Sequence, residues 1–127
     1  MAGRLAQNTA VHMGVAFLAM GCWAAFANRT HPMPGPLLAG VVQGSLSAVI
    51  TLVLKRMIES IGRRFDGPAS LWLPPLVATV LSLGILASIH ALAGTPEIAA
   101  TIALPASVTA VYSTIYSLAL WRGRKAA

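Results

Sequence analysis

Four long apolar stretches without a single Asp, Glu, Lys or Arg constrain the fold of this chain more than any other feature. They lie at 11–27, 35–54, 71–92 and 98–121. A helix needs about 20 mostly apolar residues to cross the hydrocarbon core of a bilayer, where its backbone polar groups must be bonded within the segment. The sequence therefore predicts an all-α integral membrane fold of four transmembrane helices, arranged as two hairpins.

Composition indicates lipid rather than water as the surroundings. Of the 127 residues, 57% are hydrophobic and 9% are charged, whereas an ordinary soluble domain has about 25% charged residues. So few polar groups could not cover the surface of a soluble protein of this size. We therefore expect residues 1–127 to form a single four-helix membrane domain, with a basic cytoplasmic loop at 55–70.

The basic residues predict the orientation of the helices. Lys and Arg near helix ends are retained on the cytoplasmic side of a membrane. Only Arg29 falls between the first and second helices, so both chain termini are expected in the cytoplasm. The basic residues on that side are Arg4, Lys55, Arg56, Arg63, Arg64, Arg122, Arg124 and Lys125.

This distribution places the net charge of +6 on one face of the membrane. A basic rim beside a bilayer indicates contact with anionic lipid headgroups. Binding of single-stranded nucleic acid would also need aromatic side chains interleaved with the cations, and the basic segments do not have that pattern. We expect membrane lipids, and no nucleic acid, as partners.

The segment 55–65 allows two interpretations. Met57, Ile58, Ile61 and Phe65 recur at helical spacing, with basic residues on the other sides, which is typical of an amphipathic helix lying on the inner leaflet. Alternatively, the second helix continues past the bilayer and ends at Gly62.

Prolines indicate where helices begin or bend. Pro36 is expected in the first turn of the second helix, and Pro74 and Pro75 in the first turn of the third, where a missing N–H costs nothing. Pro105 falls about two turns inside the fourth helix and predicts a bend there.

One face of the second helix predicts close helix packing. Small residues let transmembrane helices approach one another closely, and four of them recur here at spacings of four, three and four. Gln43 lies beside this strip and needs a polar partner, for which we expect a hydroxyl of the fourth helix. The strip consists of Gly40, Gly44, Ser47 and Thr51.

A semi-polar face on the fourth helix carries Pro105, Thr109, Tyr112 and Tyr116 at spacings of four, three and four. Such a face either lines a wetted groove or packs against another helix. Under the first interpretation, the residues flanking an interior path are Gln43, Thr109, Tyr112 and Tyr116.

The sequence offers no catalytic or cofactor motif. The single Cys22 excludes an internal disulfide, and no His or carboxylate is expected beside a Ser or Cys nucleophile within the bilayer. The four stretches also lack the carboxylate that a proton-coupled exporter needs. His31, His90 and Glu97 fall on one side and could meet around a metal, but their spacing matches no known metal motif. The alternative is an external charged cluster of Arg29, His31 and Glu97 that contacts a polar substrate or a partner. We therefore predict no enzyme activity, no cofactor and no metal.

With its two-hairpin plan, basic inner ends and the ending TPEIAATIALPASVTAVYSTIYSLALWRGR at 95–124, the chain resembles the GtrA-like family of small four-helix membrane proteins. That resemblance implies handling of polyprenyl-phosphate-linked sugars, a glycosyltransferase partner and a bacterial inner membrane. It also implies headgroup contacts for Trp121 and Arg122, which match the basic and aromatic elements at the ends of the family's helices.

The leading functional hypothesis is assistance in translocating or handling a lipid-linked or amphipathic substrate, by a homo-oligomer. Alternatives are a non-transporting accessory subunit, docked through the small-residue strip onto a larger membrane complex, and an oligomeric ion pore ringed by Gln43 or Tyr112. For the leading hypothesis, the expected headgroup-binding residues are Lys55, Arg56, Arg63, Arg64, Trp121 and Arg122.

Overall fold

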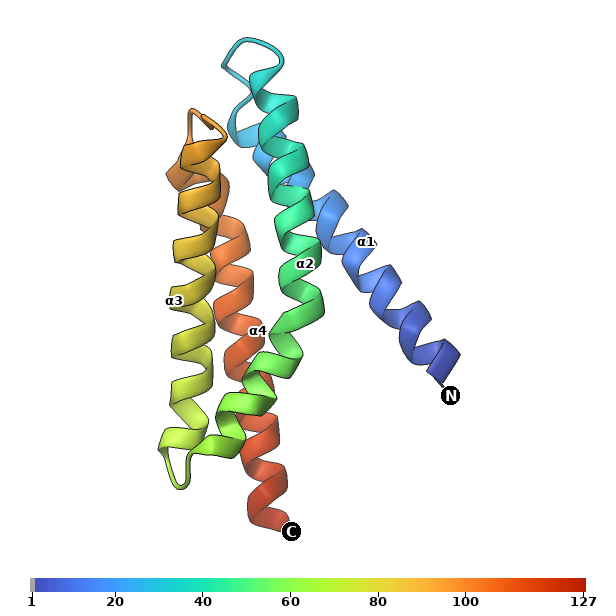
Figure 1. Cartoon of the computed structure of the whole chain (residues 1–127), viewed down its shortest axis with the longest axis vertical. Coiled ribbons are helices and arrows are strands. Elements are labelled where there is room, and N and C mark those ends of the chain that lie inside the picture. Colours follow the sequence, from blue (N-terminus) through green and yellow to red (C-terminus); the bar gives the residue numbers. More distant parts are fainter. Residues whose placement is uncertain (1) are drawn as a thin grey trace.

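The computed structural model describes residues 2–127, with side chains from residue 8 onward. Within that range the chain is all-helical and has four helices: α1 (Ala2–Ala27), α2 (Gly35–Arg64), α3 (Ala69–Leu92) and α4 (Ile98–Ala126) (Figure 1). All four are long and apolar enough to cross a membrane, which confirms the predicted fold class at that level. The side chain of Arg4, used above to predict orientation, lies outside the described side chains.

Helix α2 is ten residues longer than the stretch predicted to cross the membrane and continues through 55–64, as in the second of the two interpretations of that segment. The physical reason is tertiary packing. Leu54, Ile58 and Gly62 recur every four residues on one buried face of the helix, and Leu54 and Ile58 pack with Ala78 of α3. The helix therefore stays in the bundle and ends two residues beyond Gly62, leaving 65–68 as the connection.

Smaller differences affect the other helices. Helix α3 begins at Ala69, so Pro74 and Pro75 lie inside it rather than in its first turn. Helix α4 is unbroken through Pro105 and extends to Ala126. Pro36 lies in the first turn of α2, as predicted.

Helices α1 and α2 approach each other through glycines. A Cβ added to Gly40 would lie 3.0 Å from the Gly21 carbonyl oxygen, and one added to Gly44 would lie 2.8 Å from the Phe17 carbonyl oxygen. These separations are shorter than van der Waals contact, so the two backbones meet where a side chain would not fit. Gly21 is the α1 partner that the sequence analysis did not single out.

The two ends of the molecule differ in shape (Figure 1). We call the end with the turns 28–34 and 93–97 the turn end, and the opposite end, with the 65–68 connection and the chain termini, the terminal end. Helices α3 and α4 run side by side along their length. Helix α1 leans away from the others toward its N-terminus, which leaves space beside α2 and α4 in the half nearer the terminal end.

Candidate functional site

A cavity of about 450 Å³ occupies the space that α1 leaves beside α2 and α4. Most of its wall is apolar, with Val15 and Met20 from α1, Leu54 from α2 and Val108 from α4. Helix α3 contributes Leu86, which is fully buried. The volume falls in the usual range of small-molecule sites, about 300–1,000 Å³.

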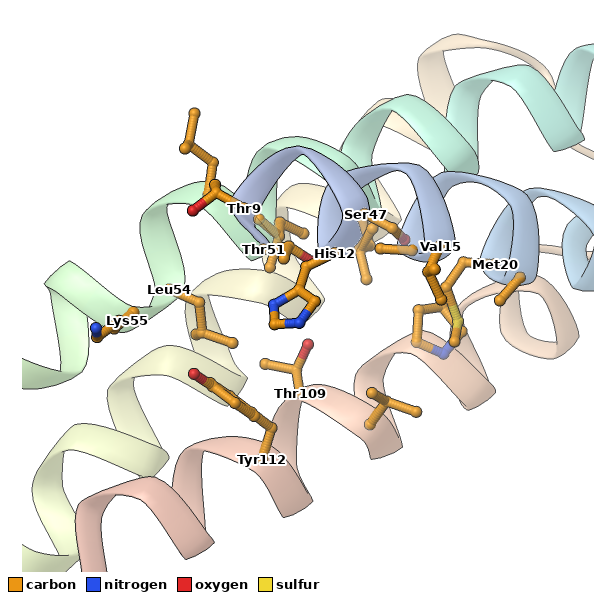
Figure 2. Close-up of a pocket in the computed structure, with 17 residues that line it drawn as sticks. Thr9, His12, Val15, Met20, Ser47, Thr51, Leu54, Lys55, Thr109 and Tyr112 are labelled. Carbon is orange, nitrogen blue, oxygen red and sulfur yellow. The ribbon is translucent and has the colours of Figure 1, made fainter. Parts of the chain in front are cut away.

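Polar and charged side chains line the cavity mainly toward one end, and Ser47 lies near the other. Figure 2 shows Thr9, Lys55 and Tyr112 toward the terminal end, and Val15 and Met20 at the opposite end. The imidazole of His12 points inward between them, facing Thr109. A ligand with a polar head and an apolar body therefore fits the cavity best in one orientation, with its head toward the terminal end.

The structure brings only part of the predicted interior path together. Thr109 and Tyr112 line the cavity, whereas Gln43 is fully buried beside α3. Its Oε1 accepts a hydrogen bond from His90 Nε2 at 2.8 Å, and its Nε2 donates to Ser47 Oγ at 2.8 Å. The expected partner on the fourth helix is therefore wrong: His90 on α3 and Ser47 on α2 satisfy the amide instead.

His90 completes a buried chain of hydrogen bonds. A carbonyl oxygen only accepts, so Nε2 of the imidazole carries the proton that bonds Gln43. The ring Nδ1 lies 2.7 Å from Thr95 Oγ1, in the turn that follows α3. Thr95, His90, Gln43 and Ser47 thus connect the turn end with Ser47 in the cavity wall.

A second polar cluster closes the turn end. Asn28, fully buried, donates to Thr101 Oγ1 at 2.7 Å and accepts from the Glu97 backbone N–H at 2.9 Å. Trp23 Nε1 donates to the Ala100 carbonyl at 3.0 Å. These bonds join α1 to the start of α4. The role of Asn28 was not predicted, because nothing local indicates a partner 73 residues away.

The two histidines of the turn end have different partners. His31 Nε2 lies 2.9 Å from Glu97 Oε1 at the surface, while His90 is buried against Gln43 and Thr95. Among the described side chains, no three His, Cys, Asp or Glu groups are placed to hold a metal ion. The one free cysteine, Cys22, is exposed.

Between α2 and α4, near the terminal end, lies the carboxylate of Glu59, to which the sequence analysis assigned no role. Tyr116 donates from its hydroxyl to Glu59 Oε1 at 2.5 Å. Tyr112 stacks on Tyr116, with ring centroids 5.8 Å apart and planes 13° apart. Both interpretations of 55–65 placed Glu59 on a helix, but nothing in the sequence indicates a partner 57 residues away.

The predicted headgroup residues are spread over the terminal end. Lys55 lines the cavity. Trp121 is half-buried, and Lys125 Nζ lies 3.8 Å from the centroid of its indole ring. The remaining four cations of the set are exposed and outside the cavity wall; they are Arg56, Arg63, Arg64 and Arg122.

The small-residue strip of α2 divides between two neighbours. Gly40 and Gly44 lie against α1, whereas Ser47 and Thr51 line the cavity. The strip therefore brings α1 close at one end and leaves hydroxyl groups facing the cavity at the other.

Chemically, the arrangement can enclose an apolar body and present hydroxyl, imidazole and ammonium groups to a polar head. A binding site for an amphipathic molecule needs these properties. No family model, no curated protein and no solved structure matches the chain.

Proposed function

We propose that this protein binds and helps to translocate or handle an amphipathic, lipid-linked substrate. The observation that carries the proposal is the cavity between α1, α2 and α4, which is apolar over most of its wall and polar at the terminal end. The apolar part of the substrate lies along Val15, Leu54 and Val108, and its headgroup meets Lys55 and Tyr112.

The distribution of charge supports the headgroup assignment. Apart from Arg29, all basic side chains that the structure describes belong to the terminal half of α2 or α4. We propose two hairpins with both termini in the cytoplasm, since cations are retained on that side. The terminal end then faces the anionic inner leaflet, where cations attract anionic headgroups.

The resemblance to GtrA-like proteins adds a substrate class to the proposal. It favours polyprenyl-phosphate-linked sugars, a glycosyltransferase partner and a bacterial inner membrane. A phosphate fits Lys55, and sugar hydroxyls fit Thr109 and Tyr112. Four helices of this size enclose little volume, so we propose that the working form is a homo-oligomer.

The two alternative functions find different support. The small-residue strip is not available for docking an accessory subunit onto a larger complex, because α1 covers Gly40 and Gly44. Such a subunit would have to dock through another surface. An ion pore ringed by Gln43 is disfavoured by the bonds of its amide to His90 and Ser47. Tyr112 has 43% of its surface exposed, so it is available to line a pore in an oligomer. Electrical recording in bilayers tests an ion pore ringed by Tyr112.

The proposal is tested by filling the cavity. Ala16 lines it from α1, so Ala16→Phe should occupy the space that the apolar body needs. We expect affinity for a fluorescent dodecyl phosphate, measured by polarisation in maltoside micelles, to fall about tenfold or more. The matched control is Ala10→Phe on the same helix, because Ala10 is exposed and does not line the cavity.

Lys55→Gln tests the headgroup assignment with the same probe. Removing the cation at the cavity should weaken binding of the phosphate about five- to tenfold, whereas Arg64→Gln, outside the cavity, should change it little. Equal binding by wild type, Ala16→Phe and Lys55→Gln would overturn the proposal. In proteoliposomes, the wild type should speed the transbilayer movement of a fluorescent anionic lipid, and Ala16→Phe should slow it.

A further inference from the structure

Glu59 is a carboxylate without an ionic partner in a strongly basic region. Among the described side chains the ion pair found is His31 with Glu97, at the other end of the molecule. Glu59 is half-buried, and its Oε1 accepts from the Tyr116 hydroxyl of α4. Its second oxygen, Oε2, has no partner among the described side chains and can accept from a further donor.

Lys55 and Glu59 stand one turn apart on α2, a spacing at which Lys and Glu commonly pair. Here they do not pair. The bond to Tyr116 holds Glu59 toward α4, while Lys55 lines the cavity. The terminal end of the cavity therefore has a positive group in its wall, and a negative group lies one helical turn further along α2, outside the wall and bonded to α4.

Tyr112 connects the carboxylate with the cavity. Its ring stacks on Tyr116, whose hydroxyl bonds Glu59, and Tyr112 itself lines the cavity near Lys55 (Figure 2). Aromatic faces attract ammonium groups, and a neighbouring carboxylate strengthens that attraction. A cation leaving the cavity along Tyr112 thus meets Glu59.

We infer that this end of the cavity recognises a zwitterionic headgroup, with an acidic phosphate on Lys55 and a primary amine between Glu59 and the Tyr112 ring. The inference rests on the proposed function and narrows its substrate class to amphiphiles whose phosphate and amine are separated by a short linker. The Cβ atoms of residues one helical turn apart lie about 5–6 Å apart, so a phosphate and an ammonium joined through a short linker can reach Lys55 and Glu59 together.

The test compares three amphiphiles that share a dodecyl chain, by displacement of the fluorescent dodecyl phosphate in maltoside micelles. They are dodecyl phosphoethanolamine, its N-acetyl derivative and dodecyl ethyl phosphate, of which only the first has an ammonium group. The wild type should bind the first about tenfold more tightly than the other two. Glu59→Gln keeps the shape and the bond from Tyr116, and it should remove this preference while leaving binding of dodecyl ethyl phosphate unchanged.

The matched control is Glu97→Gln at the turn end, which should keep the full preference for the amine. Equal affinity of the wild type for all three compounds would overturn the inference and leave the proposed function standing. Failure of all three to displace the probe would overturn the proposed function itself. Soluble phosphoethanolamine distinguishes a lipid from a free solute: we expect no displacement, and displacement would support the recognition chemistry while assigning the ligand to solution.

Discussion

The turn end and the terminal end of this molecule are held together in different ways. At the turn end, Asn28 and Trp23 bind α1 to the start of α4, and His31 meets Glu97 across the two turns. At the terminal end, hydrogen bonds join α4 to α2 through Tyr116 and to α3 through Ser117, while α1 leans away (Figure 1). Helix α1 is thus fastened near one end, and the cavity opens where it departs.

This contrast shows how four helices can leave a cavity between them when one helix is attached to the others only near one end. Lipid gives helices no hydrophobic reason to associate, so close packing and polar contacts decide where they touch. Both are concentrated in the half of α1 that contacts α2 through glycines and α4 through Asn28. The other half of α1 borders the cavity.

The largest effect is expected from Gly44→Leu, which breaks the close contact of α1 with α2. Its Cβ would meet the Phe17 carbonyl oxygen at 2.8 Å, and backbone cannot move aside cheaply. We expect the free energy of unfolding, measured by SDS titration from maltoside micelles, to fall by about 3 kcal/mol. Gly84→Leu is the control, because nothing lies within 4 Å of its added Cβ, and a similar loss there would contradict the packing argument.

Gln43→Leu should have the second largest effect, by breaking the buried chain between the turn end and the cavity. His90 Nε2 and Ser47 Oγ would both lose their partner in a buried place. We expect the free energy of unfolding to fall by about 2 kcal/mol in the same titration. Ser45→Ala serves as control, since Ser45 is exposed and bonds only its own helix at Val41; if both variants behaved alike, the buried chain would have no structural role.

Asn28→Ala tests the fastening of α1 to α4 directly. The change removes the bonds to Thr101 Oγ1 and from the Glu97 backbone. The expected loss is about 1–2 kcal/mol, because hydrogen bonds between transmembrane helices contribute modestly. Asn8→Ala, at the exposed start of the same helix, should be neutral in the SDS titration. If Asn28→Ala left the free energy of unfolding unchanged, the glycine contacts and the Trp23 bond would be enough to hold α1.

The smallest effect is expected at the terminal end from Arg124→Gln. Arg124 Nη1 donates to the Gly62 carbonyl at 3.3 Å from an exposed position. Its removal should change the free energy of unfolding by less than about 0.5 kcal/mol. A loss above about 1 kcal/mol would show that the terminal end is held as firmly as the turn end, and the contrast between them would disappear.

Much of the fold could be predicted because it depends on local composition. Uninterrupted apolar runs predict four helices long enough to span a bilayer, and Pro36 marks the first turn of α2. The glycine spacing of α2 also indicated a packing face. For the end of α2 the sequence left two interpretations open, one of which ended the helix at Gly62, two residues before the observed end at Arg64. Only the burial of Leu54, Ile58 and Gly62 against other helices decides between them.

The candidate site was less accessible from sequence. Thr109, Tyr112 and Lys55 were singled out and do line the cavity, but Gln43 and Tyr116 were assigned to the same path and lie elsewhere. His90 and Glu59 are bonded to Gln43 and Tyr116, which are 47 and 57 residues away in the sequence. Spacing within one helix cannot reveal such pairs, because it does not say how neighbouring helices are rotated.

The sequence by itself determined that this chain consists of helices suited to a membrane, because hydropathy and helix length are properties of consecutive residues. Tertiary structure alone decided which polar groups meet and where the helices part. The close approach of α1 and α2 at Gly21, Gly40 and Gly44 brings backbones from two segments together, and the pairs Gln43–His90 and Glu59–Tyr116 likewise join different helices. Such contacts depend on how the helices are placed relative to one another, and no segment taken alone contains that information.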